Sequence, residues 1–344
     1  MQTPILPYKA LALQTTCYAV NNCTNNAEAA TKMQANIQRI HTQIKASKQF
    51  IGPDLQLVVL PEYFMTGFPM SESLEAWQQK ACIHQDGAEY TALSHVAKDC
   101  AIYLSGNAYE IDPAFPDLYF QVSFIINPSG EVILRYRRLN SMFAPTPHDV
   151  LDAFIAAYGQ DALFPVVQTP IGNLACIASE EILYPEIARA LALKGAEIML
   201  HSSSEVSSYL PTQKNIAKLA RAQENMAYVV SANSAGIADI AIPFASTDGH
   251  SQIVQYEGMK IAEAANGESM NANATIHIEA LRHHRKRPGM GNFLSRQRLE
   301  LFTATYQQSI YPANSLTGKK ADKKDFVLRQ QAVIQSLIDK GIIQ

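Results

Sequence analysis

The chain has 344 residues, is 47% hydrophobic and carries a formal net charge of −3 at pH 7. This is an ordinary globular composition, and the near-neutral charge argues against nucleic acid as the main partner. No stretch reaches the roughly 18 consecutive apolar residues of a membrane span, and residues 1–16 lack a basic region ahead of an apolar core, so we expect neither a membrane segment nor a signal peptide.

The first part of the chain alternates between strand and helix patterns. A strand is predicted at residues 8–16 and a long helix at residues 27–48. The continuous apolar run LQLVVL, residues 55–60, is typical of a strand buried on both faces. A helix at residues 91–100 and a strand at residues 101–110 follow.

The middle of the chain begins with a predicted hairpin. Its strands, residues 118–126 and 131–138, flank Asn127-Pro128-Ser129-Gly130, whose residues favour a tight turn. Residues 140–163 are expected to be an irregular loop, long enough to have a function. Residues 173–200, NLACIASEEILYPEIARALALKGAEIML, predict a strand, a sharp turn, a short helix and a second strand.

The last part predicts a helix at residues 212–227, a strand at 228–236 and a hairpin at 251–264. The basic run at residues 282–287 is interpreted as a solvated segment after a strand. We expect one α/β domain over residues 1–292. Residues 293–344 form a C-terminal extension that ends in a helix and packs on the domain or on a partner subunit.

Five cysteines are present, an odd number without a CxxC pair, which predicts neither a disulfide framework nor a zinc site. A reducing cytoplasm is the simplest interpretation. Cys176 lies on the opposite face of its predicted strand from Ser179, three residues later, and is expected to be a buried structural cysteine.

Three residues at predicted strand ends are candidates for chemistry. Glu62 follows a buried strand, where open α/β sheets place ligand crevices, and is either a loop residue or a general base. Arg138 continues the apolar face of its strand and therefore needs a partner, either in a structural salt bridge or in a site. Ser179 stands before a sharp turn, as a nucleophile or as a small residue tolerated there.

Five ordered stretches resemble the signatures of the nitrilase, or carbon–nitrogen hydrolase, superfamily. They are LPEYFMTGF, NPSGEVILRYRR, IGNLACIASEEILYPEIARALALKGAEIML, RAQENMAYVVSANSAG and GHSQIV…GMKIAEA, and together they cover roughly residues 8–290. The resemblance implies an α-β-β-α sandwich, assembly into a homodimer or larger homo-oligomer, and no metal or organic cofactor. It also implies a small-molecule ligand of the amide or nitrile class.

Residue by residue, the resemblance places the family's catalytic Glu on Glu62, its Lys on Arg138 and its Cys on Ser179. The last two are departures. Serine is far less acidic than a thiol of pKa about 8.5, and arginine can stabilise an anion but cannot shuttle a proton. His201 and His148 remain as possible bases. The residues expected to contact substrate are Tyr63, His148, Glu180, Glu181 and Ser203.

Two functions follow from these residues. The first is a carbon–nitrogen hydrolase of the amidase type, in which Glu62 is the base, Ser179 the nucleophile and Arg138 the stabiliser of the oxyanion. The second is a protein that has lost hydrolysis and binds a small molecule or partner in the same pocket. The intact surrounding signatures favour the hydrolase, whereas Ser179 and Arg138 themselves favour the binding protein.

Overall fold

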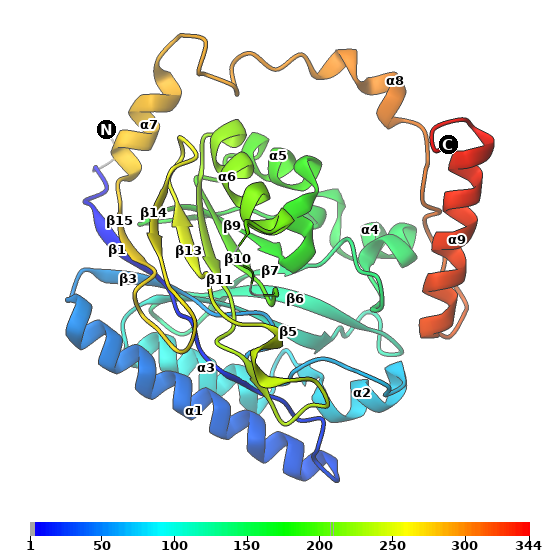
Figure 1. The fold of residues 1–344 in the computed structure, drawn as a ribbon, viewed down its shortest axis with the longest axis horizontal. Helices are drawn as coiled ribbons and strands as arrows, with labels where there is room; N and C mark the ends of the chain where they lie inside the picture. Colours follow the sequence, from blue (N-terminus) through cyan, green and yellow to red (C-terminus); the bar gives the residue numbers. More distant parts are fainter. Residues whose placement is uncertain (1–3, 207, 209) are drawn as a thin grey trace.

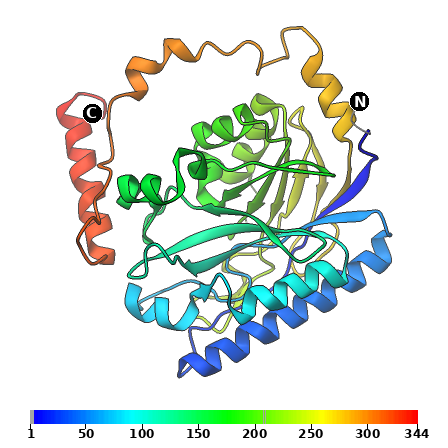
Figure 2. The ribbon, with the colours of Figure 1, turned by 180° about the vertical axis from the view of Figure 1, so that it is seen from behind.

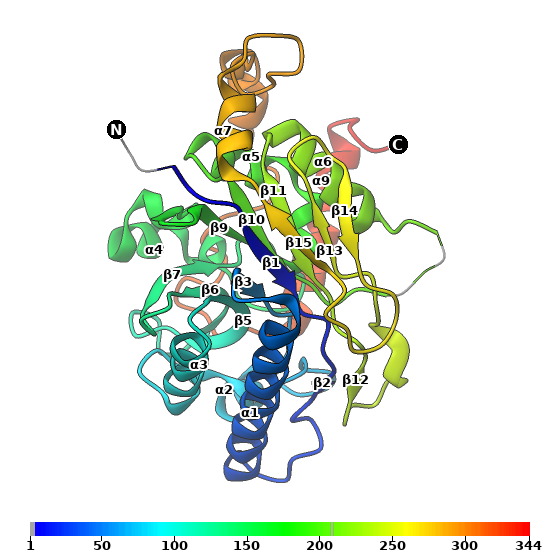
Figure 3. The same cartoon turned by 90° about the vertical axis from the view of Figure 1, so that its left-hand side faces the viewer.

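Two β-sheets lie face to face with helices on both outer sides, so the molecule is a four-layer α-β-β-α sandwich (Figures 1 and 3). The structure is a computed structural model that describes residues 4–206, 208 and 210–344. The expected fold class is confirmed. Among the described residues, no helix is both long and apolar enough to cross a membrane.

The first sheet has the order β15-β1-β3-β5-β6-β7, with β4 paired to β5. Its strands are β1 (Tyr8–Ala12), β3 (Leu55–Val59), β4 (Ile83–His84), β5 (Tyr103–Ile111), β6 (Tyr119–Ile126), β7 (Val132–Arg137) and β15 (Asn273–Ile276). The helices on its outer side are α1 (Asn26–Ile51), α2 (Leu74–Ala81) and α3 (Ala88–Asp99) (Figure 2).

The second sheet has the order β14-β13-β11-β10-β9-β8. Its strands are β8 (Val167–Thr169), β9 (Gly172–Ala178), β10 (Ile198–Ser202), β11 (Tyr228–Ala232), β13 (Gln252–Val254) and β14 (Lys260–Glu263). Helices α5 (Pro185–Leu193) and α6 (Gln213–Asn225) cover it, and a separate small ladder joins β2 (Cys17–Tyr18) to β12 (Ile237–Ala238).

Apolar side chains from both sheets form the core between them. Leu57 and Val59 of β3 belong to the same buried cluster as Leu174, Cys176 and Ala178 of β9, because alternate residues of a strand share one face. Cys176 is thus a buried core residue on the face expected for it. Burial raises the pKa of its thiol to about 12, so Cys176 is not an activated nucleophile.

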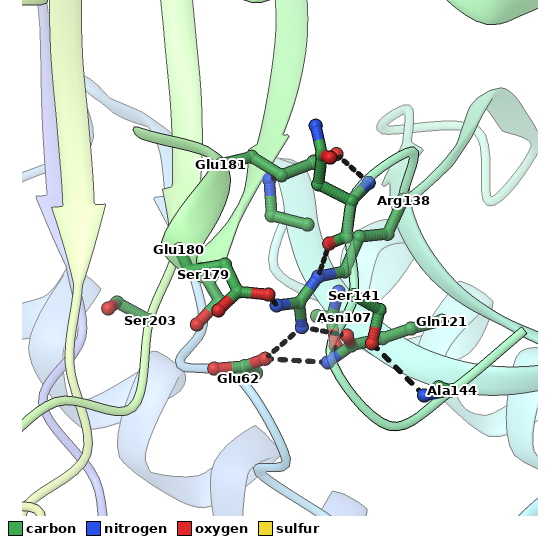
Figure 4. A network of polar contacts seen from close by, with 12 residues as sticks. Glu62, Asn107, Gln121, Arg138, Ser141, Ala144, Ser179, Glu180, Glu181 and Ser203 are labelled. Carbon is green, nitrogen blue, oxygen red and sulfur yellow. Dashed lines mark hydrogen bonds and ion pairs between the residues drawn. The ribbon is translucent and has the colours of Figure 1, made fainter. Parts of the chain in front are cut away.

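Parallel pairing brings the chemically interesting strand ends to one edge. In the first sheet β1, β3 and β5 are parallel, and in the second β9, β10 and β11 are parallel. The carboxyl ends of parallel strands meet at the same edge of a sheet. Glu62 follows β3, Ser179 follows β9 and Ser203 follows β10, while the hairpin returns the end of β7 to this region (Figure 4).

Two expectations about local structure were wrong in part. Residues 140–146 are irregular as expected, but the rest of the segment contains two 3-10 turns, Pro147–Val150 and Gln160–Leu163, around helix α4 (Leu151–Tyr158). Thr146 and Asp149 form a capping box at the start of the first 3-10 turn, and such a box stabilises the beginning of a helical segment.

The basic run follows strand β15 as expected and is partly exposed, but most of it lies in helix α7 (Ile278–Lys286), and two of its arginines are not simply solvated. Arg282 pairs with Glu197, at 2.7 Å between Nε and Oε1. Arg285 donates to the carbonyl oxygens of Met226 and Ala196, at 2.8 and 2.6 Å. These basic side chains therefore tie α7 to the second sheet and its helices.

The C-terminal extension arches away from the sandwich and returns to it on the far side (Figures 1 and 2). It contains a 3-10 turn (Leu299–Leu301), α8 (Thr303–Tyr306) and α9 (Lys323–Asp339). Leu316 and Phe326 are buried against the domain, and Lys323 Nζ donates to the carbonyl oxygen of Glu72 at 2.6 Å. The extension also contacts the domain earlier along its length, since Leu294 packs on the second sheet's outer cluster and Tyr306 Oη donates to Glu186 at 2.9 Å.

Candidate active site

Glu62 is a buried carboxylate held by side chains of the first sheet. It is 1% exposed, and its Oε1 accepts from Gln121 Nε2 at 2.6 Å and from Arg138 Nη1 at 3.2 Å. Gln121 Nε2 also donates to Asn107 Oδ1 at 3.0 Å, so hydrogen bonds between amide side chains of the sheet fix the position of Gln121. The carboxylate is therefore held in one orientation at the edge of the pocket.

Arg138 lies directly after β7 and is almost fully enclosed by acceptors. Its Nε donates to the Asn140 carbonyl oxygen at 2.6 Å, Nη1 contacts Glu62 and Gln121, and Nη2 pairs with Glu180. Burial alone would lower the pKa of Arg138, but the two carboxylates raise it above its ordinary value. Because a guanidinium has five N–H groups, these contacts leave one of them without a described partner.

Ser179 occupies the sharp turn at the end of β9. Its φ is 47°, in the left-handed region, which is uncommon for a residue other than glycine. The residue is 6% exposed. Its Oγ accepts a hydrogen bond from Lys214 Nζ at 3.1 Å, and its carbonyl oxygen lies 2.8 Å from His201 Nε2. Figure 4 shows Ser179 and Glu62 around the same space, beside the guanidinium of Arg138.

His201 is a neutral support for this turn. It is fully buried on β10, with Nδ1 at 2.8 Å from Ser231 Oγ. Burial, followed by the nearby charge of Lys218, lowers its pKa to about 3. Since the Ser179 carbonyl can only accept, Nε2 carries the proton and Nδ1 accepts from the Ser231 hydroxyl. A ring nitrogen committed in this way positions the turn and is unsuited to being a base.

Lys214 is the site residue that the sequence analysis missed. It lies in the first turn of α6 and is half-buried. Besides Ser179, its Nζ contacts Ser203 Oγ at 3.4 Å. The available signal was a lysine near a helix N-terminus, where the helix dipole disfavours positive charge. That signal is weak in a sequence, because nothing there shows that the α6 N-terminus faces Ser179.

The two carboxylates after Ser179 differ in surroundings. Glu180 has a side chain that is 35% exposed and pairs with Arg138. Glu181 is fully buried and turns the other way: Tyr136 Oη donates to it at 2.7 Å, and the backbone N–H groups of Leu139 and Asn140 donate at 2.7 and 3.0 Å. Burial raises the pKa of Glu181 to about 7. Its contacts anchor the segment after β7.

The remaining predicted substrate contacts are spread around the site. Tyr63 follows Glu62 with a φ of 61° and stacks on Tyr109, at 5.8 Å between ring centroids. Ser203 is buried, and its carbonyl oxygen accepts from the Glu62 backbone N–H at 3.2 Å. His148 lies apart from these residues: its ring packs against Tyr311 of the extension, with centroids 6.2 Å apart.

A cavity of about 800 Å³ connects His148 with the Arg138 segment. Asn140, Ser141 and Glu180 line it on the domain side. The wall opposite comes from the C-terminal extension and includes Ile310, Tyr311, Phe326, Val333, Ile334 and Leu337. The extension thus encloses space next to the Arg138–Glu180 pair.

A second buried ion pair lies one helical turn beyond Lys214. Lys218 is completely buried and pairs with Glu205, and its Nζ also donates to Asn215 Oδ1 at 3.2 Å. Burial lowers the pKa of Lys218. The pair holds the segment after β10 against α6, and so fixes the helix that carries Lys214.

Comparison with known proteins gives one family. The family model described as carbon-nitrogen hydrolase matches residues 13–286. A formamidase of Helicobacter acinonychis (strain Sheeba) is 27% identical over 232 residues, which are 67% of this chain and 64% of the formamidase. The match therefore spans slightly less than two thirds of that relative's length.

Solved structures show the same fold. A carbon-nitrogen hydrolase from Helicobacter pylori G27 matches with a TM-score of 0.65 and 20% identity, over 89% of this chain and 100% of that one. A mutant of the amidase from Nesterenkonia sp. AN1, in complex with butyramide, matches with a TM-score of 0.60 and 19% identity, over 88% and 97%. At such identities the likeness concerns the fold alone.

Proposed function

Because the chain belongs to the carbon–nitrogen hydrolase family, we propose that it hydrolyses the C–N bond of a small amide. Similarity to a formamidase supports an amide as substrate, and so does the shared fold with a mutant amidase in complex with butyramide. The observation that carries the proposal is the buried, fixed Glu62 carboxylate beside a serine in a left-handed turn at the end of β9.

The proposed reaction has two halves. Ser179 Oγ attacks the amide carbon while Glu62 accepts the hydroxyl proton, and the oxygen of the tetrahedral intermediate becomes negative. Glu62 then gives this proton to the nitrogen as the C–N bond breaks, which releases ammonia and leaves an ester on Ser179. Water attacks the ester, with its proton passing through Glu62 to Ser179, and the carboxylic acid leaves.

Arg138 contributes its charge to this cycle. A buried, permanent cation lowers the energy of a nearby developing anion even without a direct hydrogen bond, because the surroundings screen it poorly. It also pairs with Glu62, at 3.2 Å between Nη1 and Oε1, and so keeps the base oriented when the carboxylate is ionised.

A non-catalytic binding protein is the second candidate function. Four of the five N–H groups of Arg138 are engaged by Asn140, Glu62, Gln121 and Glu180, and position 179 has a hydroxyl in place of a thiol. Both observations lower the expected rate of hydrolysis and leave a polar pocket that binds an amide by hydrogen bonds.

Ammonia release from a panel of small amides separates the two functions. The parent protein should be active, and Ser179→Ala should lose at least about 10³-fold in kcat/KM, because removing a nucleophile removes the covalent route. Cys176→Ala is the matched control, since it removes the nearby buried thiol and should leave kcat/KM within about threefold. If the parent releases no ammonia but binds amides in calorimetry, the proposed hydrolase function is refuted in favour of the binding function.

We further propose that the chain forms at least a dimer, with residues 293–344 as a C-terminal extension covered in part by a second copy. Its exposed apolar side chains support this proposal, because solvated apolar surface of this extent is unfavourable. They include Leu299, Leu301, Phe302, Tyr306 and Ile310. Light scattering at micromolar concentration should give at least twice the chain mass of 37.9 kDa, and a monomer would exclude the proposal.

A further inference from the structure

We propose that Lys214 is a catalytic residue, whose ammonium group activates the Ser179 hydroxyl and binds the negative charge formed in the reaction. This inference rests on the proposed acyl transfer at Ser179. It assigns to α6 the compact cation that is absent from the end of β7, where Arg138 stands. The site is then a Ser179–Lys214 pair served by the Glu62 base.

The contacts of Lys214 set it apart from the other cations of the site. Its Nζ contacts two hydroxyl oxygens, Ser179 Oγ at 3.1 Å and Ser203 Oγ at 3.4 Å. Among residues 4–206, 208 and 210–344, no carboxylate forms an ion pair with it. Lys218, on the next turn of the same helix, has the partner Glu205. Lys214 is therefore a half-buried charge directed at a candidate nucleophile.

Helix stability does not account for Lys214. It is the second residue of α6, whose N-cap Thr212 accepts from the Asn215 N–H, and the N-terminus of a helix carries roughly +0.5 of a charge. The positive charge of a lysine in this turn is repelled by the dipole and destabilises the helix. An unfavourable cation held 3.1 Å from Ser179 Oγ indicates a role in the pocket.

The engagement of Arg138 provides the second, independent observation. Asn140, Gln121 and the two carboxylates take four of its N–H groups. Arg138 therefore cannot turn toward an oxyanion without breaking buried contacts. Lys214, in contrast, contacts only two serine hydroxyls. Rotation of its ammonium group can present any of three N–H donors to an oxyanion.

The chemistry follows from this arrangement. A cation next to a hydroxyl favours the alkoxide, so Ser179 loses its proton to Glu62 more readily as the new C–O bond forms. When the carbonyl oxygen becomes negative, a second N–H of Lys214 can donate to it. Lys214 keeps its proton throughout, and the transferred proton stays with Glu62 until the leaving nitrogen takes it.

Reaction with a fluorophosphonate tests the proposal without relying on amide turnover. This reagent phosphonylates activated serines. The serine oxygen forms a bond to phosphorus, fluoride leaves, and the base accepts the hydroxyl proton. Peptide mapping should find the adduct on Ser179 in the parent. Lys214→Met should slow the labelling by about 10²-fold, as expected for the loss of one charge-stabilising donor. Lys214→Arg, with the charge kept but the shape changed, should be intermediate.

Two controls exclude a purely structural effect. Lys194→Met removes an exposed lysine that pairs with Asp161 and should label at the parent's rate. Lys214→Ala should recover at least tenfold in labelling rate when methylammonium is added, whereas a packing defect would not respond. Thermal melts of each variant, compared with the parent, establish that the fold is intact.

The outcomes keep this inference separate from the proposed function. Labelling of Lys214→Met at the parent's rate, or no adduct on Ser179 in the parent, would overturn the role of Lys214. If labelling depends on Lys214 but the protein releases no ammonia from amides, the role of Lys214 in activating Ser179 is supported. Only the proposed amide hydrolysis is then refuted.

Discussion

Replacing Ser179 by cysteine together with Arg138 by lysine is expected to raise amide hydrolysis by about 10²–10³-fold over the parent. A thiol near a cation ionises close to neutral pH, whereas a serine must lose its proton during the attack. Lysine at position 138 would return a compact donor to the end of β7. Arg138→Lys alone should do less, because a better stabiliser still serves a weak nucleophile, and such effects are not additive.

Ammonia release from the parent, both single variants and the double variant measures this prediction. Ser179→Cys alone should show part of the gain, since Lys214 Nζ lies 3.1 Å from the position of Oγ and would favour the thiolate. A double variant that folds normally but releases no more ammonia than the parent would contradict the prediction. The pocket would then have diverged beyond these two positions, as a binding protein requires.

Removing the Glu205 carboxylate is expected to lower the free energy of unfolding by about 3–5 kcal/mol, because Glu205→Ala leaves the Lys218 ammonium buried without an ion-pair partner. Lys218 is completely buried, and its other contact is the Asn215 side chain at 3.2 Å. Urea denaturation at neutral pH measures the loss. The double variant Glu205→Gln with Lys218→Met, which removes both charges, should recover most of it.

Asp161→Ala is the surface control for this prediction. Asp161 pairs with Lys194 at 2.5 Å, and the two side chains are 98% and 35% exposed. Exposed pairs of this kind contribute about 0–1 kcal/mol. If Glu205→Ala lowered the free energy of unfolding no more than this control does, water would have to reach Lys218. The Lys218–Glu205 pair could then not be the element that fixes α6.

The positions of Glu62, Arg138 and Ser179 could be predicted because each follows a strand. Strand patterns are strong in this chain, and parallel neighbours bring their ends to one edge. The apolar face of β7 that Arg138 was expected to continue includes Leu134 and Tyr136, and both pack in the core between the sheets. Val132 breaks the alternation and packs on the opposite face, because a bulge shifts the pairing with β6.

Lys214 and Glu181 show what the sequence could not provide. Both roles depend on which way a turn faces, and a turn has no periodicity to reveal it. Glu181 follows Glu180, yet one carboxylate accepts backbone N–H groups behind β7 while the other pairs with Arg138. Lys214 reaches Ser179 only because α6 packs across the end of β9, a tertiary contact between residues 35 apart in the chain.

The left-handed backbone at Ser179 is set before any ligand reaches the pocket. A serine at φ 47° lies about 1–2 kcal/mol above an ordinary conformation, and the His201 Nε2 hydrogen bond to its carbonyl holds it there in the absence of ligand. Since His201 is neutral over the physiological range, acidification to about pH 5 would not release this hold. The turn is therefore preorganised: it adopts its strained conformation during folding, and an arriving ligand meets a hydroxyl already in place.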